Sequence, residues 1–300
     1  MYQQLFERNY GVFTVEEQQK VKKARVVLIG CGGIGSVIGS ALARSGLEHF
    51  VLYEFDTFSI TNMNRQMTCF QDTIGKNKAL VLKDNILNIN PEADIKIFER
   101  ALLPDEIPQM LSMGDVIVPS ADEWPLSITI LGAAKEYGVP AIMSYPSGAL
   151  GRVSTFMPTS PYAAECLVMP YKANYEQLKT FMNDPINRHL CQYYRTDGDW
   201  TDEWFESWCK SELPHPQICP IVWLTGTIAA MEVIKIVSGK WKPVAAPRFW
   251  HVTPEGAHIA RFSKGRMLLS HFLAKPKGAA FLRSLTKQQW LMNLFTDLLK

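Results

Sequence analysis

The sequence lacks an excess of charge of either sign. Its 300 residues carry 31 lysines and arginines against 29 aspartates and glutamates, so the formal net charge is only +2. No stretch clusters lysine or arginine with aromatic residues in the way that a nucleic-acid groove does. This balance argues against a nucleic-acid-binding protein as the first interpretation of the chain.

The sequence also has little that indicates a signal peptide, a membrane span or a disulfide framework. The start, MYQQLFERNYG, has no apolar run of signal-peptide length. The most apolar later run, Ile218 to Val237, is interrupted by Glu232 and Lys235, which favours a buried helix over a membrane span. The six cysteines are widely spread in a chain long enough to fold without disulfides. We therefore expect reduced thiols and a cytoplasmic protein.

The chain does contain an apolar strand that runs directly into a cluster of glycines. Four aliphatic residues, 26–29, precede GCGGIGS, and a helix-like run to Arg44 follows. Such a turn lets the backbone approach a phosphate, and the first N–H groups of the helix supply unpaired donors. The pattern predicts a phosphate-binding turn at Gly30, Gly32, Gly33 and Gly35.

Acidic residues follow the next apolar strand, which runs from His49 to Tyr53. Glu54 and Asp56 lie close to the position where a dinucleotide-binding fold keeps the carboxylate that accepts from ribose hydroxyls. Strand, glycine turn, helix and acid in this order predict nucleotide binding at Glu54 and Asp56 as well as at the glycines.

Strands and helices alternate from residue 25 to residue 145, which predicts an α/β fold with a Rossmann-like, doubly wound, mostly parallel sheet. We expect an N-terminal arm over 1–24, with a helix capped by Thr14 and Glu17, and one α/β domain over 25–262. The proline- and aromatic-rich stretch 159–216 is expected to be a long crossover insertion, helical near 175–182 and 199–211. Residues 263–300 are expected to form an amphipathic helical tail, capped at Thr286, that docks on a partner surface.

Polar residues gather in the loop after Asp56, where Asn62, Asn64, Arg65 and Gln66 lie close together. Loops at the carboxyl ends of parallel strands bind the ligand in open α/β folds. Lys78 opens the next expected helix, and Asp122 follows the buried strand 115–118, so both should reach the same edge of the sheet.

Taken together, these motifs resemble the ThiF/MoeB/HesA superfamily of ATP-dependent adenylating enzymes, which are related to the ubiquitin activators. The likeness runs from about residue 8 to residue 262. It rests on GCGGIGS, on Glu54-Phe55-Asp56, on Asn62-Met-Asn-Arg-Gln66, on Lys78 and Asp122, on YPSGALG at 145–151, and on the late helix ICPIVWLTGTIAAMEVIKIVSG.

The resemblance implies that a carboxylate attacks the α-phosphate of ATP and that pyrophosphate leaves. The carboxylate would be the C-terminus of a ubiquitin-like or sulfur-carrier protein, or of a peptide. Catalysis of this kind is largely positioning and electrostatic stabilisation. By the same resemblance Glu54 binds ribose, Arg65 and Lys78 face the phosphates, and Asp122 is associated with Mg²⁺.

The remaining implied positions belong to the loop and to the arm. Asn62, Asn64 and Gln66 would hold the loop or contact phosphate. Arg8 matches an N-terminal arginine that reaches the ATP of the other subunit in homodimeric members, so the resemblance implies a homodimer.

The chain also departs from the family pattern. Many relatives bind structural zinc through two CxxC pairs, whereas this chain keeps only Cys166 of the first pair and has no late CxxC, so we expect no zinc. The usual Asp-Asn after the fourth strand is here Asp122-Glu123, and the arginine that usually follows is absent. These differences predict a divergent member whose acceptor is not implied by the family alone. We expect the insertion 159–216 to recognise that acceptor.

Formation of a thioester would require a cysteine. Cys209, in WCKSELP, is similar to the active-site stretch of the single-domain activators of the ubiquitin-fold modifier, and Lys210 could favour its thiolate. Packing beside Trp208 is the equally weighted alternative. Cys219 is expected in the core, and Cys31 in a structural position.

Other functions stay open at the level of sequence. A peptide-tailoring enzyme and a tRNA threonylcarbamoyl dehydratase belong to the same superfamily. A non-catalytic half of a heterodimeric activator is a third alternative. NAD binding also fits the glycines, but no histidine lies in a recognisable catalytic string.

Overall fold

A computed structural model of the chain, which describes residues 1–184 and 198–273, contains one eight-stranded sheet with the order β3-β2-β1-β4-β5-β6-β7-β8. The strands are β1 (Arg25–Ile29), β2 (His49–Tyr53), β3 (Asp94–Phe98), β4 (Val116–Pro119), β5 (Ala141–Ser147), β6 (Leu150–Phe156), β7 (Arg248–Thr253) and β8 (Gly256–Arg261). The first five strands pair in parallel. Strands β6, β7 and β8 add antiparallel pairs. The predicted Rossmann-like α/β fold is confirmed, and its sheet is mixed.

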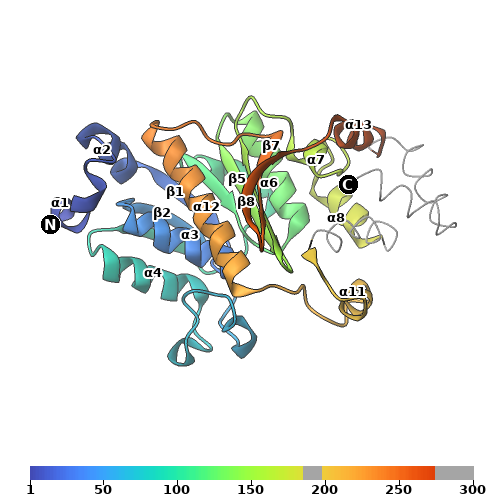
Figure 1. Ribbon diagram of the computed structural model, residues 1–300, viewed down its shortest axis with the longest axis horizontal. Helices are drawn as coiled ribbons and strands as arrows, with labels where there is room; N and C mark the ends of the chain where they lie inside the picture. The colour runs from blue at the N-terminus through green and yellow to red at the C-terminus, as the bar shows by residue number, and fades with distance from the viewer. Residues whose placement is uncertain (185–197, 274–300) are drawn as a thin grey trace.

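Helices cover both faces of this sheet (Figure 1). Side chains of β1 and β2 alternate between the faces because successive residues of a strand point to opposite sides. On one face Leu28 and Leu52 pack with α3 (Gly33–Arg44), α4 (Lys78–Ile89) and α12 (Cys219–Ser238). On the other face Ile29 and Tyr53 pack with α5 (Ile107–Leu111), α6 (Trp124–Glu136), α7 (Ala163–Cys166) and α8 (Tyr175–Asn183). Short 3-10 turns lie at η2 (Ile60–Asn62), η3 (Gln71–Thr73) and η4 (Pro104–Glu106).

The N-terminal arm consists of α1 (Tyr2–Leu5), η1 (Glu7–Asn9) and α2 (Val15–Lys23). The predicted capping box is present, because Glu17 N donates to Thr14 Oγ1 and Thr14 N donates to the Glu17 carboxylate. The arm packs against the end of α3, where Tyr2 donates to Gly46 O and Asn9 donates to Ser45 O. The arm therefore lies at the opposite end of α3 from the glycine turn.

The crossover segment leaves the sheet at Phe156 and returns at α12. The helices expected near 175–182 and 199–211 are α8 and α11 (Asp202–Cys209). Figure 1 shows α11 as an outlying helix that residues 210–218 join to α12. Residues 185–197, also part of the expected insertion, lie outside the described residues.

The sequence pattern predicts a late helix from Ile221 to Ser238; the observed helix begins two residues earlier, at Cys219, and ends at Ser238, where the capping Gly239 adopts a positive φ of 70°. Pro220 fits this earlier start because proline is tolerated in the first helical turn. In the described part of the chain α12 is the one helix long and apolar enough to cross a membrane, and 56% of its most apolar window is buried. It lies along α3, β5 and β6 as a helix of the core, in agreement with the sequence interpretation.

One carboxylate fastens α12 to the sheet. Glu232 is fully buried, and its two oxygens accept from Thr155 Oγ1 at 3.1 Å, Val244 N at 2.7 Å and Trp250 Nε1 at 2.8 Å. Lys235, one turn later, supplies the opposite charge. The acid that interrupts the apolar run in the sequence is thus a fully satisfied internal anchor.

The beginning of the C-terminal extension packs on the chain itself. Helix α13 (Lys264–Leu273) lies against α7, where Ser270 donates to Met169 O and His271 Nε2 lies 2.7 Å from Glu165 Oε1. Residues 264–273 therefore pack on the crossover segment, and docking of the tail on a partner stays a prediction. The expected helix around Phe281–Leu298, with its cap at Thr286, lies outside the described residues.

Candidate nucleotide site

The glycine turn lies where the strand order reverses, because β1 is flanked by β2 on one side and β4 on the other. Open α/β sheets bind their ligands at such a point, outside the carboxyl ends of the strands. Gly30 has a φ of +99°, and a Cβ on Gly35 would lie only 2.0 Å from Gly30 O. Helix α3 starts without a side-chain cap. The turn therefore requires glycine at these positions and presents helix N–H groups to a ligand.

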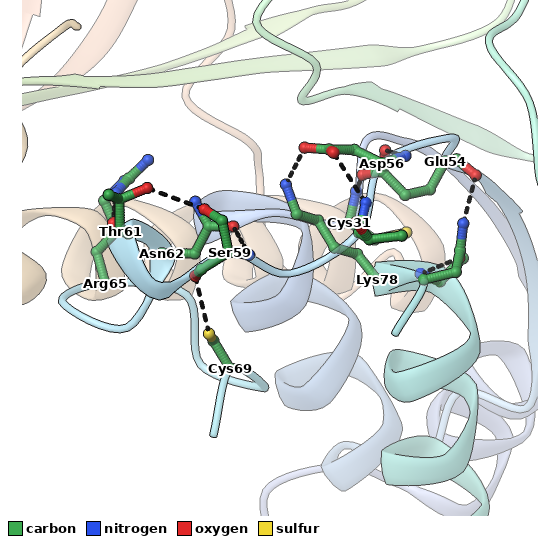
Figure 2. A network of polar contacts seen from close by, with 12 residues as sticks. Cys31, Glu54, Asp56, Ser59, Thr61, Asn62, Arg65, Cys69 and Lys78 are labelled. Atoms are coloured by element: carbon green, nitrogen blue, oxygen red, sulfur yellow. Dashed lines mark hydrogen bonds and ion pairs between the residues drawn. The ribbon is translucent and has the colours of Figure 1, made fainter. Parts of the chain in front are cut away.

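Glu54 holds the glycine turn through hydrogen bonds to the backbone. Its buried carboxylate accepts from Cys31 N at 2.8 Å and from Asp56 N at 2.9 Å (Figure 2). A carboxylate has about four acceptor positions, so these two hydrogen bonds leave acceptor capacity on Glu54, and the contact with ribose implied by the family stays a prediction. Burial raises the pKa of Cys31 well above its usual range, and the nearby Glu54 raises it further. Cys31 is therefore a neutral packing residue, as expected.

Lys78 and Asp56 form an ion pair beside the glycine turn (Figure 2). Lys78 is the first residue of α4, and its side chain is only 7% exposed. Asn77 caps this helix by accepting from Ala79 N and Leu80 N, which fixes the position of the lysine. A buried ammonium group held by one carboxylate retains two N–H donors for an anionic ligand.

The loop that carries Asn62, Asn64, Arg65 and Gln66 folds back over the glycine turn. The Arg65 side chain lies 3.8 Å from the position of a Cβ on Gly33, and the Gln66 amide lies 3.4 Å from that on Gly32. Asn62 accepts from Ser59 N and so holds the loop, as the resemblance implied. Gln66 is buried, and its Oε1 makes no hydrogen bond to any described residue, which leaves an acceptor beside the turn.

Two residues that the sequence did not suggest hold this loop from α12 and from the segment before it. Gln217 accepts from Arg65 Nε at 2.7 Å, and Trp223 Nε1 donates to Arg65 O at 2.8 Å. No local sequence signal points to either residue, because both lie more than 150 positions away along the chain.

Asp122 lies in the exposed bend after β4. This bend contacts the glycine turn directly, since Ser120 Oγ donates to Gly30 O and a Cβ on Gly30 would lie 2.8 Å from Ala121 N. Glu123 accepts a hydrogen bond from Tyr175 of α8 and, with burial, raises the tyrosine pKa to about 12. Asp122 is thus brought to the predicted edge and tied to the crossover segment.

Asp122 is also suited to the expected metal. Within residues 1–184 and 198–273 no three or more His, Cys, Asp and Glu side chains form a metal-binding group. Mg²⁺ in nucleotide sites is held by one or two carboxylates together with substrate phosphates. A single exposed carboxylate beside the glycine turn fits that coordination, and the role of Asp122 as a Mg²⁺ ligand stays a prediction.

Three cysteines outside the turn differ in their surroundings. Cys166 is buried, and burial raises its pKa to about 12; the absence of zinc stays a prediction. Cys219 is half-buried at the start of α12, so the expectation that it lies in the core is wrong. Cys209 ends α11 and is also half-buried, next to the packed rings of Trp200, Trp208 and His215.

Arg8 is a predicted site residue that does not reach the edge. It is exposed in η1, and the adjacent Asn9 contacts the far end of α3. The structure therefore leaves Arg8 outside the site of its own chain.

The chain matches the ThiF family over residues 6–267. It is 30% identical over 142 residues to the tRNA threonylcarbamoyladenosine dehydratase of Haemophilus influenzae, covering 47% of this chain and 54% of that protein. It is 26% identical over 141 residues to the sulfur carrier protein adenylyltransferase of Thermus thermophilus, covering 47% of this chain and 52% of that protein. The chain thus matches only about half the length of these relatives.

Solved structures of Escherichia coli MccB have the same fold. The complex with MccA-N7isoASN aligns with a TM-score of 0.67 at 21% identity and covers 87% of this chain and 72% of that one. The complex with ATP aligns with a TM-score of 0.64 at 21% identity and covers 83% of this chain and 67% of that one.

Proposed function

The chain belongs to the ThiF family, and we propose that it uses ATP to convert a carboxylate into an acyl-adenylate, with release of pyrophosphate. The observation that carries the proposal is that three groups suited to phosphate chemistry border one glycine turn. Lys78 is linked to the turn through Asp56 and Glu54. Arg65 lies against Gly33, and the bend of Asp122 lies against Gly30.

The proposed reaction forms a bond between a carboxylate oxygen and the α-phosphorus of ATP while the bond from that phosphorus to the bridging oxygen of pyrophosphate breaks. Negative charge develops on the phosphate oxygens, so fixed donors lower the barrier. Lys78, Arg65 and the N–H groups at the start of α3 supply these donors. When bound by Asp122, Mg²⁺ would neutralise part of the phosphate charge.

Binding of ATP can be tested without knowing the acceptor. We expect wild-type protein to bind Mg-ATP in calorimetry and not NAD, and we expect Lys78→Ala to bind ATP at least about tenfold more weakly, because a charged hydrogen bond is lost. Lys76→Ala is the matched control, since Lys76 is an exposed lysine two residues before Lys78. Binding of NAD would favour a dinucleotide enzyme, and binding of neither nucleotide would favour a non-catalytic scaffold.

For the acceptor we propose a peptide or a small carrier protein with a free C-terminal carboxylate. Relatives are named for sulfur carriers and for a modified tRNA, and MccB is solved with MccA-N7isoASN. The described end of the crossover is acidic, with five exposed acids against one exposed lysine: Asp199, Asp202, Glu203, Glu206 and Glu212 against Lys210. Such a surface repels a phosphate backbone. Pyrophosphate release with free-acid peptides, their C-terminal amides and bulk tRNA would separate these acceptors.

The second step that we propose is transfer of the acyl group from the adenylate to Cys209: a bond forms between Cys209 Sγ and the acyl carbon, the bond from that carbon to the phosphate oxygen breaks, and AMP leaves with loss of the thiol proton. Burial raises the pKa values of Cys31 and Cys166, which makes these two thiols poor nucleophiles. Cys209 lies half-buried in the segment proposed to contact the acceptor. A thioester at Cys209 would appear as a covalent adduct that excess thiol removes.

We also propose a homodimer. The outer side of α12 exposes large apolar side chains, among them Leu224 at 40% and Met231 at 49%. The adjoining loop exposes Ile60 and Phe70, and Trp223 joins the two surfaces through Arg65. Neighbouring exposed apolar side chains of this kind are typical of a protein–protein interface. A second copy would also supply an arm whose Arg8 is not used at its own site.

If the protein is a homodimer, acidic substitutions on the outer side of α12 should halve the mass of the sedimenting species. Leu224→Glu combined with Met231→Glu should weaken self-association by at least about a hundredfold, since each buried acid would lack a partner. Sedimentation would then show monomer, with little change in melting temperature because both side chains are exposed in one chain. Leu103→Glu, at a 52% exposed leucine on the other face, is the control. A wild-type monomer would refute the proposal.

A further inference from the structure

Arg65 is held in a fixed orientation before any ligand binds. Its Nε donates to Gln217 Oε1 at 2.7 Å, and its Nη1 donates to Thr61 O at 3.0 Å and to Asn64 Oδ1 at 2.8 Å. Within the described residues Nη2 makes no hydrogen bond. Since a guanidinium has a rigid planar fork of five N–H donors, fixing Nε and Nη1 also fixes the direction of Nη2.

Gln217 is itself held on two sides. Its carbonyl oxygen accepts from Asn64 Nδ2 at 3.1 Å, so side chain and backbone both contact the Arg65 loop. On the other side Gly148, in the turn between β5 and β6, forms a bridge with Gln217, and Gly148 N donates to Pro216 O at 2.7 Å. Gln217 therefore connects the arginine loop to the sheet.

The segment leading to Gln217 is anchored in the aromatic cluster at the end of the crossover. The His215 ring lies 4.6 Å from that of Trp200 and 5.9 Å from that of Trp208, at near-perpendicular angles. Burial, helped by the charge of Arg65, lowers the pKa of His215 to about 4. His215 is therefore neutral at pH 7, and of these two side chains only Arg65 carries a positive charge.

We propose that Gln217 is the positioning residue of Arg65: it holds the guanidinium so that Nη2 faces the triphosphate, and it links the crossover segment to the nucleotide site. This inference rests on the proposed function. Preorganisation of a donor in this way saves the cost of ordering a long side chain when the nucleotide binds.

The test compares ATP with adenosine, which lacks phosphates. Gln217→Met keeps the length and packing of the side chain but removes the acceptor for Nε, and Gln217→Asn keeps polarity but shortens the reach. We expect either variant to bind ATP about tenfold more weakly, as for a lost hydrogen bond to a charged group, and to bind adenosine unchanged. A purely structural role would weaken both ligands.

A double-mutant cycle makes the test specific for Arg65. Arg65→Ala should weaken ATP binding more than Gln217→Met, and the double variant should bind no more weakly than Arg65→Ala alone. Trp204→Phe is the control, because it deletes a different hydrogen bond to the same segment, from Trp204 Nε1 to Pro214 O at 2.9 Å; it should bind ATP normally.

The two possible failures can be told apart. If Arg65→Ala weakens ATP binding and neither Gln217 variant does, or if the two effects simply add, the positioning role is refuted while the proposed function stands. If Arg65→Ala leaves ATP binding unchanged, Arg65 does not bind phosphate, and that part of the proposed function is refuted.

Discussion

Replacement of Asp122 by asparagine is expected to slow acyl-adenylate formation by about a hundredfold to a thousandfold, the loss typical for a single group that stabilises transition-state charge. The substitution keeps the shape of the exposed bend and removes only its negative charge. The bend itself is held by Ser120, which donates to Gly30 O, so the glycine turn should not move. Pyrophosphate release with the acceptor found in the peptide screen measures the effect.

A second readout of the same variant needs no acceptor. If Asp122 helps to hold Mg²⁺, the wild type should bind ATP more tightly with Mg²⁺ than with a chelator, and Asp122→Asn should lose most of that difference. Asp105→Asn is the control, because Asp105 is an exposed acid of η4 that has no part in the proposed mechanism. Equal rates and equal Mg²⁺ dependence in wild type and Asp122→Asn would remove Asp122 from the proposed mechanism.

Removal of the internal anchor of α12 should have the largest effect on stability. Glu232→Ala leaves Lys235 without its counter-charge and leaves Val244 N and Trp250 Nε1 without acceptors. Breaking a buried pair by removing one partner costs about 3–5 kcal/mol. We expect the melting temperature to fall by on the order of 10 °C, measured by calorimetry or circular dichroism.

Two matched variants separate charge from hydrogen bonding in this anchor. Glu232→Gln retains an acceptor for one of the donors and should lose less than the alanine variant. Lys235→Met removes the opposite charge while the three other donors to Glu232 remain. A change of less than about 2 °C in Glu232→Ala would mean that the carboxylate does not anchor the helix.

The parts of the fold that sequence predicts well are those encoded by neighbouring residues. The capping box of Thr14 and Glu17 needs a separation of three positions, and the glycine turn follows directly from strand β1. The edge location of Glu54, Lys78 and Asp122 also follows from chain order, because the carboxyl ends of parallel strands lie together. For these features the local pattern and the fold agree.

The parts that sequence misses depend on distant pairs. Gln217 and Trp223 approach Arg65 only because α12 crosses the sheet beside the glycine turn, after more than 150 intervening residues. Glu232 interrupts an apolar run, which the sequence could read only as an argument against a membrane span. Its partners, on β6, on β7 and before β7, are visible only in three dimensions. The start of α12 at Cys219 and the partial exposure of that cysteine also differ from the expectation.

The antiparallel end of the sheet separates the segment proposed to recognise the acceptor from the site proposed to bind ATP. Strands β6, β7 and β8 pair in an antiparallel arrangement, which requires no helical crossover, and the described parts of the chain between Phe156 and Cys219 add no strand to the sheet. The length and sequence of this segment can therefore change while the glycine turn and Lys78 keep their places. Evolution could therefore change the acceptor while the ATP site is retained. The same change could be engineered by grafting this one segment, provided that the hydrogen bond between Gln217 and Arg65 is kept.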